Sequence, residues 1–188
     1  MKTLAQIWQD VPAQWAGVPV PSLVSDSRLV KQGSVFVALA GLHHDARRHV
    51  PAALAAGAGA ILVEAGGEWL AHGEQAGVPV LVVPELTQQL GQFAARFYDQ
   101  PAADMTVMAV TGTNGKTSIA NLMAGAALQL GRRSAVIGTL GNGFYGELAA
   151  SQFTTPDPLQ LQRLLAEFHD RGAELVAMEA SSHGLEQG

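Results

Sequence analysis

Short apolar runs alternate with helical patterns along the first part of the chain. Residues 34–39 (SVFVAL) are rich in β-branched and aromatic side chains, which predicts a strand. Residues 60–64 and 78–83 are two further apolar runs of strand length. Residues 47–56 carry apolar positions at helical spacing and end at Gly57, a common helix stop. Helices between buried strands predict an α/β fold with a mainly parallel sheet.

The same alternation continues after a short hinge at residues 84–87. The predicted order is helix 86–98, strand 105–110, helix 118–130, strand 133–138, helix 158–171 and strand 174–178. The run 105–110 is apolar on both faces, which predicts a place in the interior of a sheet. We therefore expect two α/β domains, residues 1–86 and residues 87–188.

Composition excludes several classes of protein. Of 188 residues, 48% are apolar and 14% are charged, so the chain can bury a substantial core and is not expected to be disordered. The formal net charge of −5 argues against nonspecific binding to nucleic acid or to an anionic membrane. The absence of cysteine excludes disulfides, Cys-ligated zinc and thiol nucleophiles. No apolar run reaches the ~18 residues of a membrane span, so we expect a soluble, cytoplasmic protein.

Residues 110–118 (VTGTNGKTS) join a predicted strand to a predicted helix and carry a phosphate-loop pattern. Gly112 and Gly115 would let the backbone N–H groups approach phosphates, and the helix N-terminus adds partial positive charge. Lys116 would reach the β- and γ-phosphates, and the hydroxyl of Thr117 would bind Mg²⁺. The strict pattern requires glycine at position 110, where valine stands, so only its inner half is present. The alternative is a glycine turn with a solvated lysine.

A phosphate-loop enzyme also needs an acidic group near the metal, and Glu179 is the candidate. It ends the apolar run LVAME, and ligands of open α/β sheets bind at the carboxyl ends of strands. Magnesium takes hard oxygen ligands, few of them from protein. The alternative is a strand-end glutamate that faces water.

Four segments together resemble one family. They are SDSR at 25–28, TGTNGKTS at 111–118, TTPD at 154–157 and MEASSHGL at 178–185. Their order and spacing resemble the Mur ligases of peptidoglycan synthesis, and TTPD and SSHGL resemble the members that add the third residue of the stem peptide. The half phosphate loop is that family's own form.

The resemblance implies an N-terminal domain that binds the UDP-sugar end of the substrate, followed by a central ATPase domain. It implies ATP-dependent amide formation through an acyl phosphate, with ATP and Mg²⁺ as cofactors. The acceptor would be UDP-MurNAc-L-Ala-D-Glu, and the amine would come from meso-diaminopimelate or L-Lys. Partners would be these small molecules only, with the full-length protein a cytoplasmic monomer.

The resemblance also assigns roles to residues. ATP binding falls on Gly112, Thr113, Asn114, Gly115, Lys116, Thr117 and Ser118. Lys116 and Glu179 would be catalytic, with Thr117 and Glu179 as metal ligands. Contacts to the UDP-muramoyl peptide fall on Ser25, Ser27, Leu42, His43, His44, Phe153, Thr154, Thr155, Ser181 and Gln187.

Some of these positions have simpler readings. Arg28, Arg47 and Arg48 could offer charge to a diphosphate, or could be solvated surface arginines. The TTPD segment could be a helix N-terminus capped by Thr155 or Asp157.

Two other functions fit parts of the sequence. One is a noncatalytic UDP-sugar and nucleotide-binding module, although Lys116, Thr117 and Glu179 are all retained. The other is a folylpolyglutamate synthase-like ligase, which shares the variant loop but not the SDSR segment. Set against the family pattern, the chain is expected to stop within the central domain. We therefore expect no ligase turnover from these 188 residues alone.

Overall fold

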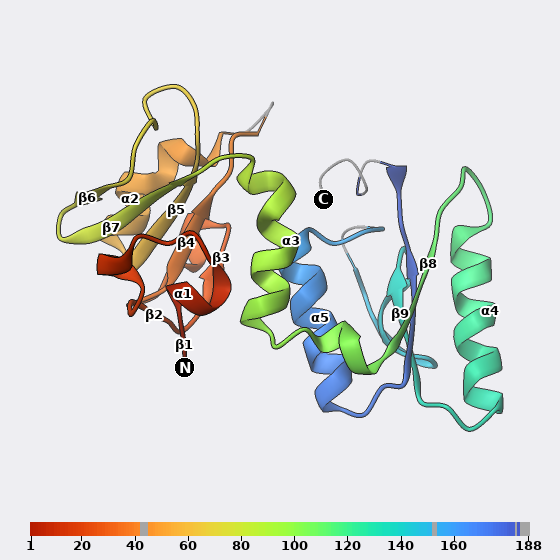
Figure 1. The fold of residues 1–188 in the computed structure, drawn as a ribbon. Coiled ribbons are helices and arrows are strands. Elements are labelled where there is room, and N and C mark those ends of the chain that lie inside the picture. The colour runs from red at the N-terminus through yellow and green to blue at the C-terminus, as the bar shows by residue number, and fades with distance from the viewer. Residues whose placement is uncertain (42–44, 152–153, 183, 185–188) are drawn as a thin grey trace. The chain divides into compact units, whose positions relative to one another are not determined.

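The computed structural model describes residues 1–41, 45–151, 154–182 and 184. It divides the chain into two compact units, Met1–Phe97 and Tyr98–Gly188. Each unit is built around its own five-stranded sheet (Figure 1). In the part of the chain that the structure describes, no helix is both long enough and apolar enough to cross a membrane.

The first unit combines a short antiparallel strand pair with a larger sheet and its covering helices. Its elements are β1 (Lys2–Thr3), α1 (Leu4–Ile7), η1 (Ala13–Trp15), β2 (Pro19–Val20), β3 (Leu23–Val24), η2 (Ser27–Leu29), β4 (Val35–Ala38), η3 (Ala46–His49), α2 (Val50–Ala55), β5 (Ala60–Glu64), β6 (Gly73–Gln75), β7 (Val78–Val83) and α3 (Leu86–Phe97). Elements marked η are 3₁₀ turns.

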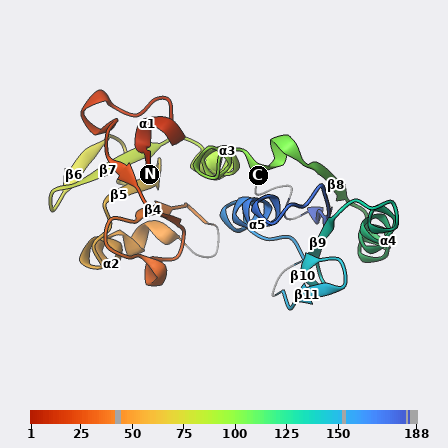
Figure 2. The same cartoon turned by 90° about the horizontal axis from the view of Figure 1, so that it is seen from below.

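The larger sheet has the strand order β3-β4-β5-β7-β6, parallel except for β6. Side chains alternate between the two faces of a strand. Phe36, Ile61 and Val80 therefore share one face, where they cluster with Val50 and Ala53 of α2. In Figure 2, α2 and α1 lie on opposite sides of this sheet. The predicted parallel strands are confirmed, but the predicted helix 47–56 begins as the 3₁₀ turn η3, which Asp45 caps.

Helix α3 packs within the first unit, although the sequence had suggested a domain boundary at residue 86. Its apolar face is buried, and the ring of Phe93 lies 6.3 Å from that of Trp8, centre to centre. Arg96 Nη1 also donates to the carbonyl of Ile7 at 3.3 Å. These contacts to the N-terminal segment explain why the compact units divide after Phe97.

The second unit has helices on both faces of a mixed sheet. Its elements are η4 (Pro101–Asp104), β8 (Thr106–Val110), α4 (Lys116–Gln129), β9 (Ser134–Gly138), β10 (Gly141–Phe144), β11 (Glu147–Ala149), α5 (Pro158–Asp170) and β12 (Leu175–Glu179). The strand order is β11-β10-β9-β12-β8, with β9, β12 and β8 parallel and the β10–β11 hairpin antiparallel. Helices α4 and α5 lie on opposite faces of the parallel part (Figure 1).

Among the described residues, β8 lies at the edge of the sheet rather than at the predicted interior position, and no described strand pairs along its outer side. Met108 is 36% exposed, and no residue of β8 is fully buried. Apolar residues on both faces of a strand therefore show neither that the strand is covered on both faces nor how many strands pair with it.

Candidate nucleotide and substrate site

The phosphate-loop pattern forms a strand–loop–helix turn. The loop leaves β8, and α4 begins at Lys116. Gly112 and Gly115 have φ angles of +137° and +82°, a region of backbone conformation that residues other than glycine rarely adopt. Among the described residues no side chain caps α4, so its first N–H groups are available to a ligand. Lys116 Nζ donates to the carbonyl of Gly112 at 2.8 Å, which folds the lysine over the loop.

Thr113 and Asn114, which lie between the glycines, are exposed. In the first turn of α4, Ser118 is exposed, whereas Lys116 and Thr117 are half-buried. A backbone turn with exposed N–H groups at the start of a 14-residue helix is a suitable place for an anion.

Thr117 and Glu179 meet beside this loop, although 62 residues separate them. The Thr117 hydroxyl donates to Glu179 Oε2 at 2.9 Å. Glu179 ends β12, next to β8 in the sheet, and is only 2% exposed. The carboxylate also accepts the backbone N–H of Thr139 at 2.7 Å and lies 3.3 Å from the Thr139 hydroxyl. The structure therefore brings the predicted residues Thr117 and Glu179 together, and Thr139 also contacts the Glu179 carboxylate.

Thr139 is missing from the sequence prediction, although one signal for it was present. It directly follows β9, which pairs with β12, so it lies at the same carboxyl edge as Glu179. The rule that located Glu179 applies equally to polar residues that follow neighbouring parallel strands.

Gly138 provides the space that the Glu179 side chain occupies. A Cβ atom built on Gly138 would lie 2.9 Å from Glu179 Cδ and 3.0 Å from Cγ, and closer still to Oε1. Real Cβ atoms essentially never approach another heavy atom to less than 3.0 Å. A larger residue at position 138 would therefore force the Glu179 carboxylate to move.

A second polar cluster surrounds the carboxyl end of β12. The Thr155 hydroxyl lies 3.1 Å from the Glu179 carbonyl and accepts the Ser181 N–H at 3.0 Å. Thr154 Oγ1 lies 3.1 Å from Thr139 Oγ1. Three residues expected to contact the muramoyl peptide therefore lie around Glu179. Helix α5 is capped by Asp157, which accepts the N–H of Gln160 at 2.9 Å. This confirms the alternative prediction that residues 154–157 form a capped helix N-terminus, with Asp157 as the cap.

The donor set beside the loop fits a magnesium ion that is shared with a nucleotide. A buried carboxylate and a hydroxyl supply hard oxygen atoms, and Mg²⁺ normally completes its shell with water and phosphate. No group of three or more His, Cys, Asp or Glu side chains in the described ranges could hold a metal ion by itself. Thr117 and Glu179 are therefore the residues that could hold the ion once phosphates are present.

Ser25 and Ser27 line one cavity of about 500 Å³ in the first unit. Asp26, Arg28, Ala46 and His49 are among its other lining residues. The two predicted serines are thus brought to one site. Predictions for Leu42, His43, His44, Phe153 and Gln187 fall outside the described residues.

Two Asp-x-Arg turns flank this cavity. In each, the aspartate accepts the N–H of the arginine two residues later, and the guanidinium forks onto the carboxylate: Asp26 with Arg28 and Asp45 with Arg47. These arginine hydrogen bonds lower the pKa of both carboxyl groups to about 2. The two guanidinium groups already have ionic partners.

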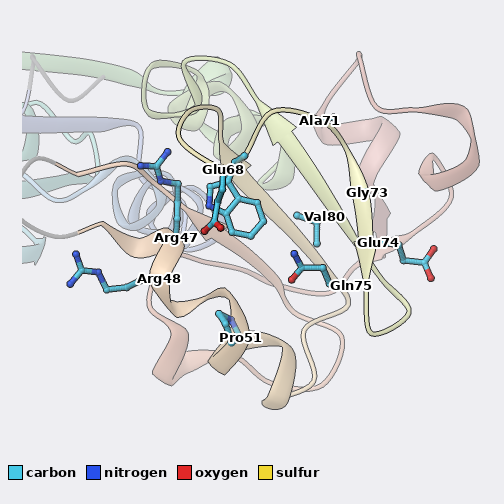
Figure 3. Close-up of a pocket in the computed structure, with 10 residues that line it drawn as sticks. Arg47, Arg48, Pro51, Glu68, Ala71, Gly73, Glu74, Gln75 and Val80 are labelled. Carbon is cyan, nitrogen blue, oxygen red and sulfur yellow. The ribbon is translucent and has the colours of Figure 1, made fainter.

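Arg47 and Arg48 line a different cavity, of about 460 Å³ (Figure 3). Arg47 Nη1 donates to the carbonyls of Gly66 at 3.0 Å and Glu64 at 3.4 Å. The Arg47 guanidinium is therefore already bonded to groups of the first unit, and it does not line the cavity of Ser25 and Ser27. That Arg28, Arg47 and Arg48 offer charge to a diphosphate stays a prediction; Arg28 lines the cavity of Ser25 and Ser27, whereas Arg47 does not.

Two family models match the chain. The Mur ligase family catalytic domain matches residues 19–98, and the Mur ligase middle domain matches residues 110–188. The chain belongs to the Mur ligase family. The first match ends one residue after α3, close to the division between the two compact units.

Similar proteins narrow the family to one branch. The chain is 45% identical over 182 residues to the UDP-N-acetylmuramoyl-L-alanyl-D-glutamate--2,6-diaminopimelate ligase of Chromobacterium violaceum. It is 46% identical over 181 residues to the protein of the same name from Ectopseudomonas mendocina. These matches include 96% of this chain but only 36% and 37% of the relatives, so this Mur ligase chain spans little more than a third of their length.

Solved structures agree with this assignment. A structure of a ligase of that same name is 37% identical, with a TM-score of 0.84 over 100% of this chain and 38% of that one. MurF from Acinetobacter baumannii is 24% identical with a TM-score of 0.61, over 96% of this chain and 36% of that one, which shows a shared fold. The mixed α/β architecture predicted from the sequence is confirmed.

Proposed function

We propose that this chain binds the UDP-muramoyl substrate and the phosphates of ATP in an amide ligase of peptidoglycan precursor synthesis. The ligase would add meso-diaminopimelate, or L-Lys, to UDP-MurNAc-L-Ala-D-Glu. The observation that carries the proposal is the meeting of Thr117 and Glu179 beside the phosphate loop. It occurs in a chain 45% identical to a ligase whose name states this reaction with 2,6-diaminopimelate.

The reaction needs activation because a carboxylate is a poor electrophile. Transfer of the γ-phosphoryl group of ATP to the acceptor carboxylate gives an acyl phosphate and ADP. The amine then attacks the acyl carbon, the amide bond forms, and inorganic phosphate leaves. Lys116 would place its ammonium group on the transferring phosphate and balance its charge. Mg²⁺, held by Thr117 and Glu179, would neutralise phosphate charge.

The substrate would bind at two places. Ser25 and Ser27 would hold the uracil and diphosphate end in the cavity of the first unit. Thr154, Thr155 and Ser181 would hold the peptide end beside Glu179, through hydroxyls that now bond to the protein. Because both nucleotide-linked substrates are cytosolic metabolites, we also propose a cytoplasmic location.

Calorimetric titration tests this function. The chain should bind UDP-MurNAc-L-Ala-D-Glu and UDP with measurable heat, and dihydrofolate should give none. Ser27→Ala should weaken UDP binding, whereas Ser118→Ala, in the first turn of α4, should leave it unchanged. Binding of dihydrofolate without binding of UDP would instead identify a folate-type ligase.

A further inference from the structure

The carboxylate of Glu64 joins two segments of the first unit that are distant in sequence. Glu64 ends β5. Its Oε2 accepts the backbone N–H of Ala40 and the hydroxyl of Thr87, both at 2.8 Å. Its Oε1 accepts the backbone N–H of Thr87 at 3.2 Å. The same side chain therefore fixes the chain just after β4 and the first turn of α3.

The other end of the β4–η3 connection is fixed at the same place. The Asp45 carboxylate holds the Arg47 guanidinium at 2.7 Å, and Arg47 Nη1 reaches the carbonyls of Glu64 and Gly66. Ala40 and Asp45 also form an antiparallel bridge. Both ends of the connection are thus tethered to the end of β5, one by a carboxylate and the other by a guanidinium.

The tethered segment leads directly into the wall of the serine-lined cavity. Ala46 and His49 line that cavity, and the N–H of Ala46 donates to the carbonyl of Leu39 at 3.0 Å. Glu64 itself is absent from the described cavity lining. It can influence a ligand only through the backbone that it holds.

We propose that Glu64 is a positioning residue for nucleoside diphosphate binding, acting through the N–H of Ala40 on the cavity wall formed by Ala46 and His49. The proposal rests on the proposed function, which places UDP in that cavity. Hydrogen bonds to a charged acceptor are among the stronger ones, so loss of the carboxylate frees this backbone. Binding must then order it again, which weakens affinity.

A purely structural role makes a different prediction, because Glu64 also holds the start of α3. Thr87→Val removes one hydrogen bond to Glu64 at α3 and leaves the Ala40 contact in place. Glu64→Gln weakens both contacts. Glu74→Gln, on the exposed strand β6, is the matched control because it removes a carboxylate from the same unit.

The test is calorimetric titration of the intact chain and these variants with UDP, alongside thermal melting. We expect Glu64→Gln to raise the Kd for UDP about tenfold, with Thr87→Val and Glu74→Gln within twofold of the unsubstituted chain. Melting temperatures should fall for both Glu64→Gln and Thr87→Val. An unchanged Kd in Glu64→Gln, or an equal rise in Thr87→Val, would overturn the positioning role.

The unsubstituted chain provides a second readout should Glu64→Gln fail to fold. Amide hydrogen exchange at Ala40 should slow when UDP is added, since binding at the cavity wall stabilises the contact with Glu64. Unchanged exchange at saturating UDP would overturn the inference while leaving UDP binding intact. Failure of the unsubstituted chain to bind UDP would overturn the proposed function and this inference together.

Discussion

Substitution of Gly138 by alanine tests whether the position of the Glu179 carboxylate matters. The added methyl group would overlap the Glu179 side chain and push it away from Thr139 and Thr117. Overpacking costs about 1–3 kcal/mol, and a lost hydrogen bond to a charged group costs about 1.5–3 kcal/mol. The lower entropy of the unfolded alanine chain offsets about 0.4–1 kcal/mol.

The net expected loss is about 3–4 kcal/mol in the free energy of unfolding. For a domain of this size that corresponds to a fall of about 20 °C in the melting temperature of the second unit. Displacement of the carboxylate should also weaken the binding of ATP in the presence of Mg²⁺ by about tenfold. Circular dichroism melting and calorimetry measure the two effects.

Gly17→Ala is the control for this experiment. A Cβ atom at Gly17 meets nothing within 4 Å, so this variant should match the unsubstituted chain in melting and in ATP binding. The reasoning is refuted if Gly138→Ala folds and binds ATP with Mg²⁺ as tightly as the unsubstituted chain. The carboxylate would then tolerate displacement, and its location at the loop would have no bearing on the nucleotide.

Three further predictions concern both units. Lys116→Ala should weaken ATP binding in calorimetry at least tenfold with an unchanged melting temperature. The control Lys31→Ala should change neither the ATP affinity nor the melting temperature. Equal ATP affinity in both variants would show that Lys116 does not bind phosphate. His72→Leu should destabilise the first unit by about 1–3 kcal/mol in urea unfolding, because His72 Nδ1 accepts the buried N–H of Val82 at 3.0 Å; unaltered unfolding would argue that water replaces the ring. The pKa of Asp45 is about 2, below its ordinary 3.8, so its contribution to stability is complete above pH ~4 and is lost as the pH falls towards 2. Between pH 5 and pH 2 the melting temperature should accordingly fall less for Asp45→Asn than for the unsubstituted chain. An identical fall of the melting temperature in both proteins would contradict this prediction.

Local sequence patterns predicted the elements whose formation depends on local chemistry. The run at residues 60–64 and the glycine-lysine loop at 112–116 specify a buried strand and an anion-binding turn by themselves. The pairing of Thr117 with Glu179 also followed, because strand ends of a parallel sheet gather at one edge.

Features that depend on distant contacts could not be predicted in the same way. Glu64 ends a strand like any other glutamate, and only the folded chain brings Ala40 and Thr87 to it. Strand β10 contains two glycines and an asparagine, which have weak strand propensity, so no periodic signal in the sequence marked the β10–β11 hairpin. Gly138 looked like an ordinary strand end, although its lack of a side chain makes room for Glu179.

The Mg²⁺ dependence of ATP binding tests the central claim most directly. Calorimetric titration of ATP, with and without Mg²⁺, should show tighter binding with the metal for the unsubstituted chain and for Glu147→Gln, an exposed control on β11. In Glu179→Gln the metal should give little or no gain in affinity. An identical Mg²⁺ response in Glu179→Gln would contradict the account and leave Glu179 as a structural residue of the second unit.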